Sequence, residues 1–162
     1  YNANSYLLTT LTNLVGKKFT ATHMTFGAIH EMEAAQGYRR LLTLADHPVL
    51  TQILNGIIRE ESAHCQFYWS VARLELNRND LARRIARFIT EHFWAPVGQG
   101  ALSKKRTAYM IATLFSDDQA MSILDKTVTQ RVRQLPGFRD ITKMTETIGG
   151  IAKNSKFQLE TA

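Results

Sequence analysis

A chain of 162 residues with 44% hydrophobic and 21% charged residues has the length and composition of one globular domain with its own core. Its single cysteine, Cys65, excludes an internal disulfide framework and predicts a reducing compartment, the cytoplasm. No apolar run reaches the roughly 18 residues of a membrane-spanning helix, and no signal peptide is visible.

The net charge of +6 comes from the second half of the chain. Residues 1–77 carry six Lys or Arg against six Asp or Glu, and residues 78–162 carry fourteen against eight. This excess is typical of solvated helix faces, and it would also suit docking to an acidic partner. Lys104, Lys105 and Arg106 are the basic residues most suited to such a contact. Nucleic acid is not expected as a partner, because no known binding motif appears.

Apolar residues recur at helical spacing along most of the chain. A first helix is expected over residues 5–15, and two long helices over about 20–45 and 49–76. Pro48 fixes its own φ and disfavours a helical conformation at the residue before it, so we expect a turn there. The two long helices should therefore form an antiparallel hairpin.

Shorter helices are expected in the second half. One covers residues 81–93 after an N-cap in the Asn77-Arg-Asn-Asp80 segment, and a loop follows over residues 94–100. The next helices cover residues 104–115 and the stretch from a capping box at residues 116–119 through Val132. The tail from Phe138 is expected to hold one short helical stretch, then Gly149-Gly150 and a frayed end.

Three residues of the predicted hairpin suggest a metal site. Glu31 lies fifteen residues before Asp46 and Glu61 lies fifteen after it, so both carboxylates should lie at nearly the same height. His64 follows Glu61 on the same helix face. One carboxylate facing a Glu-x-x-His pair is half of a carboxylate-bridged dinuclear site in a helical bundle. Such ligands suit iron or manganese, with open positions for dioxygen.

The simpler explanation for these residues is a buried polar network in which His64 donates to a carboxylate. A lone Glu-x-x-His pair is a weak signal, because it often arises by chance. Glu31 interrupts the row expected to face inward, whereas Glu33 shares a row with Gly37 and Arg40 and is expected on a solvated face. The remaining members of the inward row are small or apolar: Met24, Gly27, Ala28, Ala34, Ala35, Tyr38, Leu41, Leu42 and Ala45. The neighbouring side chains expected to be structural or solvent-exposed are His23, His30, Cys65, Tyr68 and Trp69.

The hairpin resembles the second half of the soluble acyl-acyl carrier protein desaturases, most closely the mycobacterial type. The likeness is carried by His30-Glu31-Met-Glu-Ala-Ala-Gln-Gly-Tyr-Arg-Arg, His47-Pro48-Val-Leu and Ile57-Ile-Arg-Glu-Glu61-Ser-Ala-His64-Cys-Gln-Phe-Tyr68. It continues through Phe93-Trp-Ala-Pro-Val-Gly, residues 123–132 and Leu135-Pro-Gly. The resemblance covers most of the chain, with strict motif identity confined to the hairpin.

The resemblance implies a ferritin-like helical bundle of antiparallel helices, usually dimeric, with two irons held by two copies of a Glu plus Glu-x-x-His arrangement. It implies an enzyme that inserts a double bond into a fatty acyl chain on acyl carrier protein, using dioxygen and electrons from a ferredoxin-type donor. Glu31 and Glu61 are then iron-bridging or terminal carboxylates, and His64 is an iron ligand. Four residues would border the acyl tunnel or, equally, allow close helix packing: Met24, Gly27, Ala34 and Ala35.

The family's first Glu and first Glu-x-x-His would lie before Tyr1, and no other Glu-x-x-His occurs in the sequence. With no Met at its start, the chain is expected to be one helical domain over residues 1–162, the C-terminal part of a larger ferritin-like domain. Three alternatives stay open. They are a ferritin-like ferroxidase whose site a second chain completes, a related diiron oxygenase acting on a non-lipid substrate, and a metal-free helical interaction module.

Overall fold

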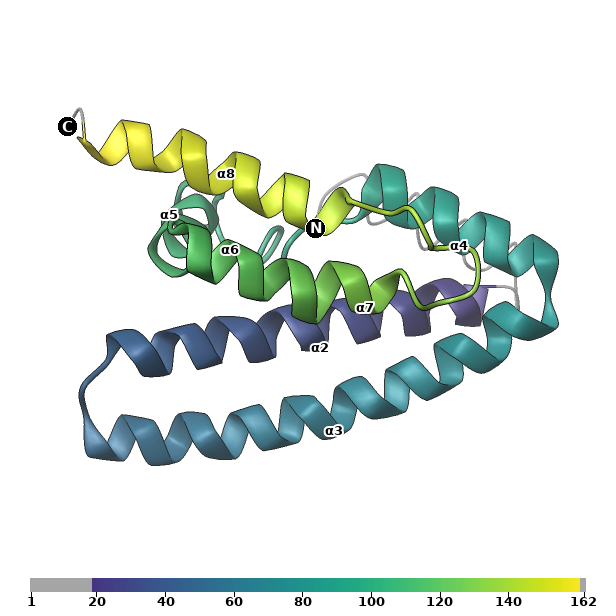
Figure 1. The fold of residues 1–162 in the computed structure, drawn as a ribbon, viewed down its shortest axis with the longest axis horizontal. Coiled ribbons are helices and arrows are strands. Elements are labelled where there is room, and N and C mark those ends of the chain that lie inside the picture. The colour runs from purple at the N-terminus through teal and green to yellow at the C-terminus, as the bar shows by residue number, and fades with distance from the viewer. Residues whose placement is uncertain (1–18, 161–162) are drawn as a thin grey trace.

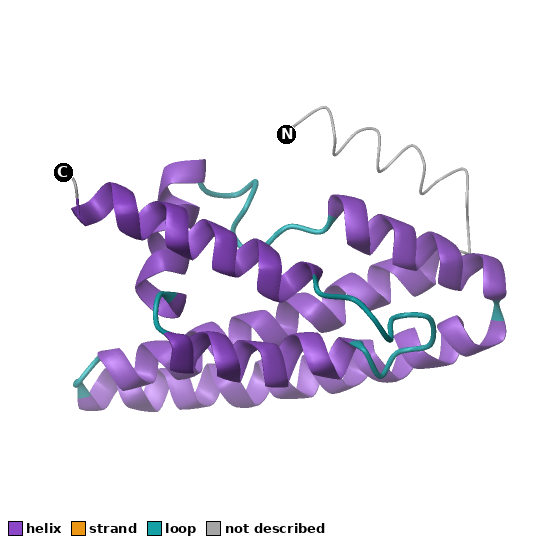
Figure 2. Cartoon of the chain, turned by 45° about the horizontal axis from the view of Figure 1, so that its top comes forward, coloured by secondary structure: helices purple, strands orange, loops and turns teal. Residues whose placement is uncertain are grey.

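The computed structural model describes residues 19–160, so the helix expected over residues 5–15 lies outside the described part. The described residues form helices joined by loops, without a strand, and the all-α helical bundle predicted from the sequence is confirmed (Figure 2). Within this range, none of the helices combines the length and the apolar character needed to cross a membrane.

Two long antiparallel helices form the predicted hairpin (Figure 1). Helix α2 covers Phe19–Leu44 and helix α3 covers Pro48–Arg78, so both predicted ranges are confirmed to within two residues. Pro48 occupies the first turn of α3, where its missing N–H leaves no helical bond unmade. The Nδ1 atom of His47 caps the helix by accepting from the Leu50 N–H at 3.4 Å.

Shorter helices follow the hairpin, and their bounds agree with the predicted ranges. Helix α4 covers Asp80–Phe93 and α5 covers Lys104–Phe115. The stretch predicted to be helical through Val132 consists of α6 (Asp118–Leu124), the π-helical turn η2 (Asp125–Thr129) and α7 (Gln130–Val132). Side-chain caps begin three of these helices, since Asn79 accepts from the first turn of α4, Ser103 from that of α5 and Asp117 from that of α6. The N-cap of α6 is thus Asp117 and not Ser116, with which the predicted capping box begins.

The expectation of a short helix followed by a frayed tail after Phe138 is wrong. Helix α8 covers Lys143–Glu160 and runs through Gly149 and Gly150 without a break. Met144, Ile148 and Ala152 recur every four residues on its buried face. Burial of this stripe outweighs the cost of about 1 kcal/mol that each glycine brings to a helix interior.

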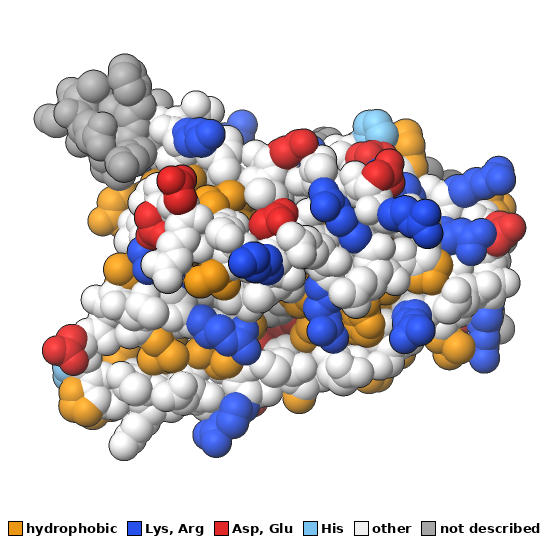
Figure 3. All heavy atoms as spheres, viewed as in Figure 1, with side chains coloured by type: hydrophobic (Ala, Val, Ile, Leu, Met, Phe, Trp, Pro, Cys, Tyr) orange, Lys and Arg blue, Asp and Glu red, His pale blue; other side chains and the backbone are white. Residues whose placement is uncertain are grey.

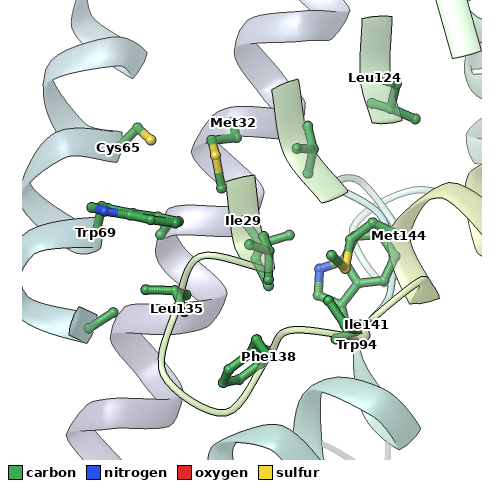
Figure 4. Close-up of a cluster of buried hydrophobic side chains, with 14 of the residues drawn as sticks. Ile29, Met32, Cys65, Trp69, Trp94, Leu124, Leu135, Phe138, Ile141 and Met144 are labelled. Carbon is green, nitrogen blue, oxygen red and sulfur yellow. The ribbon is translucent and has the colours of Figure 1, made fainter. Parts of the chain in front are cut away.

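Helix α2 lies at the centre of the molecule. Helix α3 packs along one side of it, and α4, α5, α6 and η2 pack along others. Figure 4 shows the core that results, in which Ile29 and Met32 of α2 meet Cys65 and Trp69 of α3 on one side. Residues from the second half of the chain close the other side: Trp94, Leu124, Leu135, Phe138, Ile141 and Met144. Two faces of α2 are therefore buried instead of one.

The Tyr68 ring of α3 packs against Gly27 of α2, where a Cβ atom would lie 2.5 Å from Cδ1 of that ring. Gly27→Ala should therefore lower the free energy of unfolding by about 1–3 kcal/mol, because the clash outweighs the better helix propensity of alanine. Gly56→Ala is the matched control, since a Cβ atom there meets nothing within 4 Å. That change should raise the free energy of unfolding by roughly 0.5–1 kcal/mol. Urea unfolding measures both, and stabilisation by both changes would contradict the close approach.

Candidate metal centre

The hairpin brings Glu31, Glu61 and His64 together, as the spacing on either side of the turn predicts. One ligand atom of each residue lies within 4.8 Å of the others. The His64 Nδ1 atom is 3.5 Å from Oε2 of Glu61 and 3.9 Å from Oε2 of Glu31. Within residues 19–160, these side chains form the one group of three or more His, Cys, Asp or Glu residues arranged closely enough to hold a metal ion. Their role as metal ligands stays a prediction.

The electrostatics of the site favour a bound cation. Burial raises the pKa of Glu31 to about 7, and the hydrogen bond and negative charge of Glu61 act in the same direction, while His64 opposes the shift. The negative charges of the two carboxylates thus disfavour each other, and a metal ion that binds both can neutralise them. Carboxylate and imidazole donors suit iron or manganese, whereas thiolate donors, which are typical of structural zinc sites, are absent from this group.

The three residues lie at the edge of an open hollow of about 610 Å³. The side chain of His64 is 59% exposed, whereas those of Glu31 and Glu61 are 22% and 19% exposed. The other side of the hollow comes from α2 and from the loop after α4: Phe26, His30, Ala34, Tyr38, Phe93, Ala95, Pro96, Val97, Gly98 and Gln99. Small molecules can therefore reach the carboxylates from this side.

His30 supports the loop beside the hollow. Its Nε2 atom lies 3.1 Å from the carbonyl oxygen of Ala95, and burial lowers its pKa although this hydrogen bond opposes the shift. The Trp94 ring packs beside it, with ring centres 6.3 Å apart. The interpretation of His30 as a structural residue agrees with these contacts. His23 is exposed, which also agrees with its prediction.

The placement of Glu33 on a solvated face is wrong. This residue is only 5% exposed, and both carboxylate oxygens accept from the Val97 N–H, at 3.1 and 3.2 Å. Burial raises its pKa to about 8, although the Val97 hydrogen bond opposes the shift. The row is buried because the second half of the chain covers this face of α2. Arg40, on the same row, likewise pairs with Asp117 instead of facing solvent.

The four residues proposed for an acyl tunnel do not share one cavity. Ala34 lines the hollow beside the three candidate ligands, whereas Ala35 lines a second hollow on another side of α2. Gly27 faces the Tyr68 ring, and Met24 packs against the core.

Two other sets of residues lie where their predicted roles would place them. Cys65 is buried, and burial raises the pKa of its thiol, as expected for a structural cysteine. Lys104, Lys105 and Arg106 are exposed in the first turn of α5. Docking of a carrier protein at these three cations stays a prediction.

The residues that sequence reasoning missed are three cations that line the second hollow, Arg39, Lys126 and Arg131. The position of Arg39 had a signal, because Glu31, Ala35 and Arg39 recur every four residues and share one row of α2. The sequence carried no such signal for Lys126 and Arg131, because only the tertiary fold brings their segment beside α2.

Comparisons of the chain with protein-family models, with curated proteins and with solved structures found no match. The geometry of Glu31, Glu61 and His64 is therefore the observation from which a function is argued.

Glu33→Gln tests the burial of a carboxyl group beside the site. The pKa of Glu33 is about 8 in the folded chain against an ordinary value of 4.5, so the folded state binds more protons between these values. Its contribution to stability is thus present below pH 4.5 and is lost as the pH rises toward 8, by up to about 1.4 kcal/mol per pH unit. Any advantage of the wild type at low pH should disappear by pH 8, where Glu33→Gln should be the more stable protein.

Urea unfolding of metal-free protein from pH 5 to pH 8 measures this difference. Glu60→Gln is the control, since Glu60 is exposed on α3 and the change should leave the pH dependence unaltered. Unfolding free energies of Glu33→Gln and wild type that run parallel over this range would contradict the burial of an ionisable group.

Proposed function

We propose that this chain carries half of a carboxylate-bridged dinuclear iron centre and acts as part of an acyl-[acyl carrier protein] desaturase. The observation that carries the proposal is the meeting of Glu31, Glu61 and His64 from two adjacent antiparallel helices, with ligand atoms within 4.8 Å of one another. These are one Glu and one Glu-x-x-His, which is half of the ligand set of such a centre. The second half of that set is not among residues 19–160.

A bound pair of iron ions supplies the activation of dioxygen and the removal of hydrogens from an unactivated methylene pair. The chain's own residues hold and orient the reactants. Glu31 and Glu61 would provide negative charge that balances the metal, and His64 would provide an imidazole nitrogen at the exposed edge. The α2–α3 packing holds these side chains in place without a loop contributing a ligand.

An apolar hollow of about 360 Å³ beside the site supports a lipid substrate. It lies between α2 and α5, and it shares Ala34, Tyr38 and Val97 with the hollow that holds the three candidate ligands. Its further lining is almost entirely apolar: Leu41, Met110, Ile111, Leu114 and Phe115, with Tyr109 and Thr113 at the edge. An acyl chain lying here would pass the metal ligands, with Glu33 buried and neutral along its path.

A second candidate is a ferroxidase whose site two copies of this chain complete. The open hollow around the three residues favours it, because a second Glu and Glu-x-x-His could approach from that side. The two candidates differ in metal stoichiometry. A desaturase binds about two irons per polypeptide that contains both ligand sets, whereas the ferroxidase binds about two per dimer of this chain.

Glu61→Ala and His64→Ala test the ligand assignment. Each change removes one donor from the three, so iron content after expression in iron-replete medium should fall at least about tenfold, in line with the loss of a metal ligand. Glu60→Ala is the matched control, because it removes an adjacent exposed carboxylate of the same helix and should leave the iron content unchanged. Elemental analysis of the purified protein measures iron per chain. Unchanged iron in Glu61→Ala would refute the assignment.

Ala34→Phe tests the substrate class. Ala34 lines both hollows, so a phenyl ring there should block their junction and lower the formation of desaturated acyl product at least about tenfold, with iron content unchanged. Ala63→Phe is the control, since Ala63 is exposed on α3. Mass spectrometry of the acyl chain, with dioxygen and a ferredoxin-type donor supplied, measures the product. Equal product from both variants would contradict the proposed path of the chain.

A further inference from the structure

A second hollow of about 620 Å³ opens on another side of Glu31, between α2, α3 and the α6–α7 segment. We call it the basic groove, because Arg39, Lys126 and Arg131 line it. Figure 3 shows Lys and Arg side chains along the α6–α7 segment and where this segment faces α3. The buried part of the lining, which forms the floor, is mostly apolar, with Met32, Ala35 and Cys65 beside Gln36. Ile123 adds an exposed apolar side chain, and the remaining lining residues are polar: Ser62, Gln66, Thr127 and Gln134.

The three cations of the basic groove have no carboxylate partner in the part of the chain that the structure describes. Among the described residues, Arg39, Lys126 and Arg131 take part in no ion pair, although other arginines of the chain pair with Asp or Glu. Asp125 is the nearest acid in sequence to Lys126, and its oxygens accept from Thr145 and Gln130, both at 2.8 Å. The positive charge of the groove is therefore available to a ligand.

Arg131 is positioned by an aromatic ring instead of by an acid. Its guanidinium carbon lies 5.0 Å from the centre of the Trp69 ring, which belongs to the core. This contact holds the guanidinium beside the groove and leaves its N–H donors unpaired by any carboxylate of the described residues. A planar guanidinium that is held in this way suits bidentate recognition of phosphate.

The backbone of this segment departs from α-helical geometry where it lines the groove. Lys126 and Thr127 belong to η2, the π-helical turn between α6 and α7. Single π-helical turns inside α-helices are frequent at functional sites, because the inserted residue shifts side chains around the helix axis. Here the turn lies in the chain between Ile123 and Arg131, both of which line the groove.

We propose that the basic groove binds a phosphate ester with an apolar body, its phosphate on Arg39, Lys126 and Arg131 and its body on the apolar floor. Glu31 is the one acid among the residues that line the groove, and it lies at the boundary with the hollow of the metal centre. A ligand held here would thus have its anionic group fixed and its apolar body near Glu31. That this ligand is the substrate of the metal centre rests on the proposed function, whereas its binding does not.

An acidic protein surface is the competing ligand, and the shape of the groove disfavours it. The lining is concave with an apolar floor, which suits a small amphiphile better than a row of carboxylates on a helix. Lys104, Lys105 and Arg106 are exposed on α5 and do not line the groove, so they form a separate basic cluster for such a partner.

Calorimetric titration of the full chain with hexyl phosphate, in the presence of a metal chelator, tests the proposal. We expect saturable binding at least about tenfold tighter than that of inorganic phosphate, since only the ester also uses the apolar floor. The double variant with Lys126→Glu and Arg131→Gln should bind hexyl phosphate at least about tenfold more weakly. Binding should also change the fluorescence of Trp69, because the ligand would contact Arg131, whose guanidinium lies over the Trp69 ring.

Lys104→Glu is the matched control, since it changes the net charge as Lys126→Glu does but lies outside the groove. Lys104→Glu should leave the affinity for hexyl phosphate unchanged. If the double variant does not fold, Lys126→Glu alone should still weaken the binding. Absence of binding to the wild type, or equal affinity in Lys126→Glu and Lys104→Glu, would overturn the proposal. So would tighter binding of polyglutamate than of hexyl phosphate at the same cations. Because the chelator removes metal, this titration does not depend on the metal centre. A failure of the iron assays would therefore refute the proposed function without affecting the test of the groove.

Discussion

The close antiparallel packing of α2 on α3 is the constraint on which the rest of the molecule depends. A glycine on one helix lets the Tyr68 ring of the other lie against its backbone. One turn further along α2, Glu31 meets Glu61 and His64. Because all three side chains come from helix interiors, their separation is set by the packing of the helices and not by a loop.

Because other elements cover α2 on two sides, its charged residues lie in different surroundings. Glu31 and Glu33 are two residues apart, so they point to different sides of the helix. Glu31 faces α3 and the hollow of the metal centre, whereas Glu33 faces the loop after α4 and is bound by the backbone of Val97. Burial raises the pKa of both carboxyl groups, but only Glu31 has a second carboxylate and an imidazole within reach. Metal binding is therefore proposed for Glu31 and not for Glu33.

Most of the fold could be predicted from local signals. The turn at Pro48, the cap at Asn79 and the apolar spacing of the long helices act within a few residues, so the sequence displays them directly. The prediction for the tail is wrong because two consecutive glycines interrupt a helix only where tertiary packing does not stabilise that helix. In α8, the buried stripe of Met144, Ile148 and Ala152 supplies that packing against distant elements.

The sequence by itself determined that Glu31, Glu61 and His64 meet, because a tight turn and a constant rise per residue place residues at equal distances from the turn side by side. Only the tertiary structure decided which other faces of α2 are buried. Helical periodicity identifies an apolar face, but it does not tell which distant segment covers a polar one. The burial of Glu33 and the gathering of Arg39, Lys126 and Arg131 around one groove both depend on where the second half of the chain folds back onto α2.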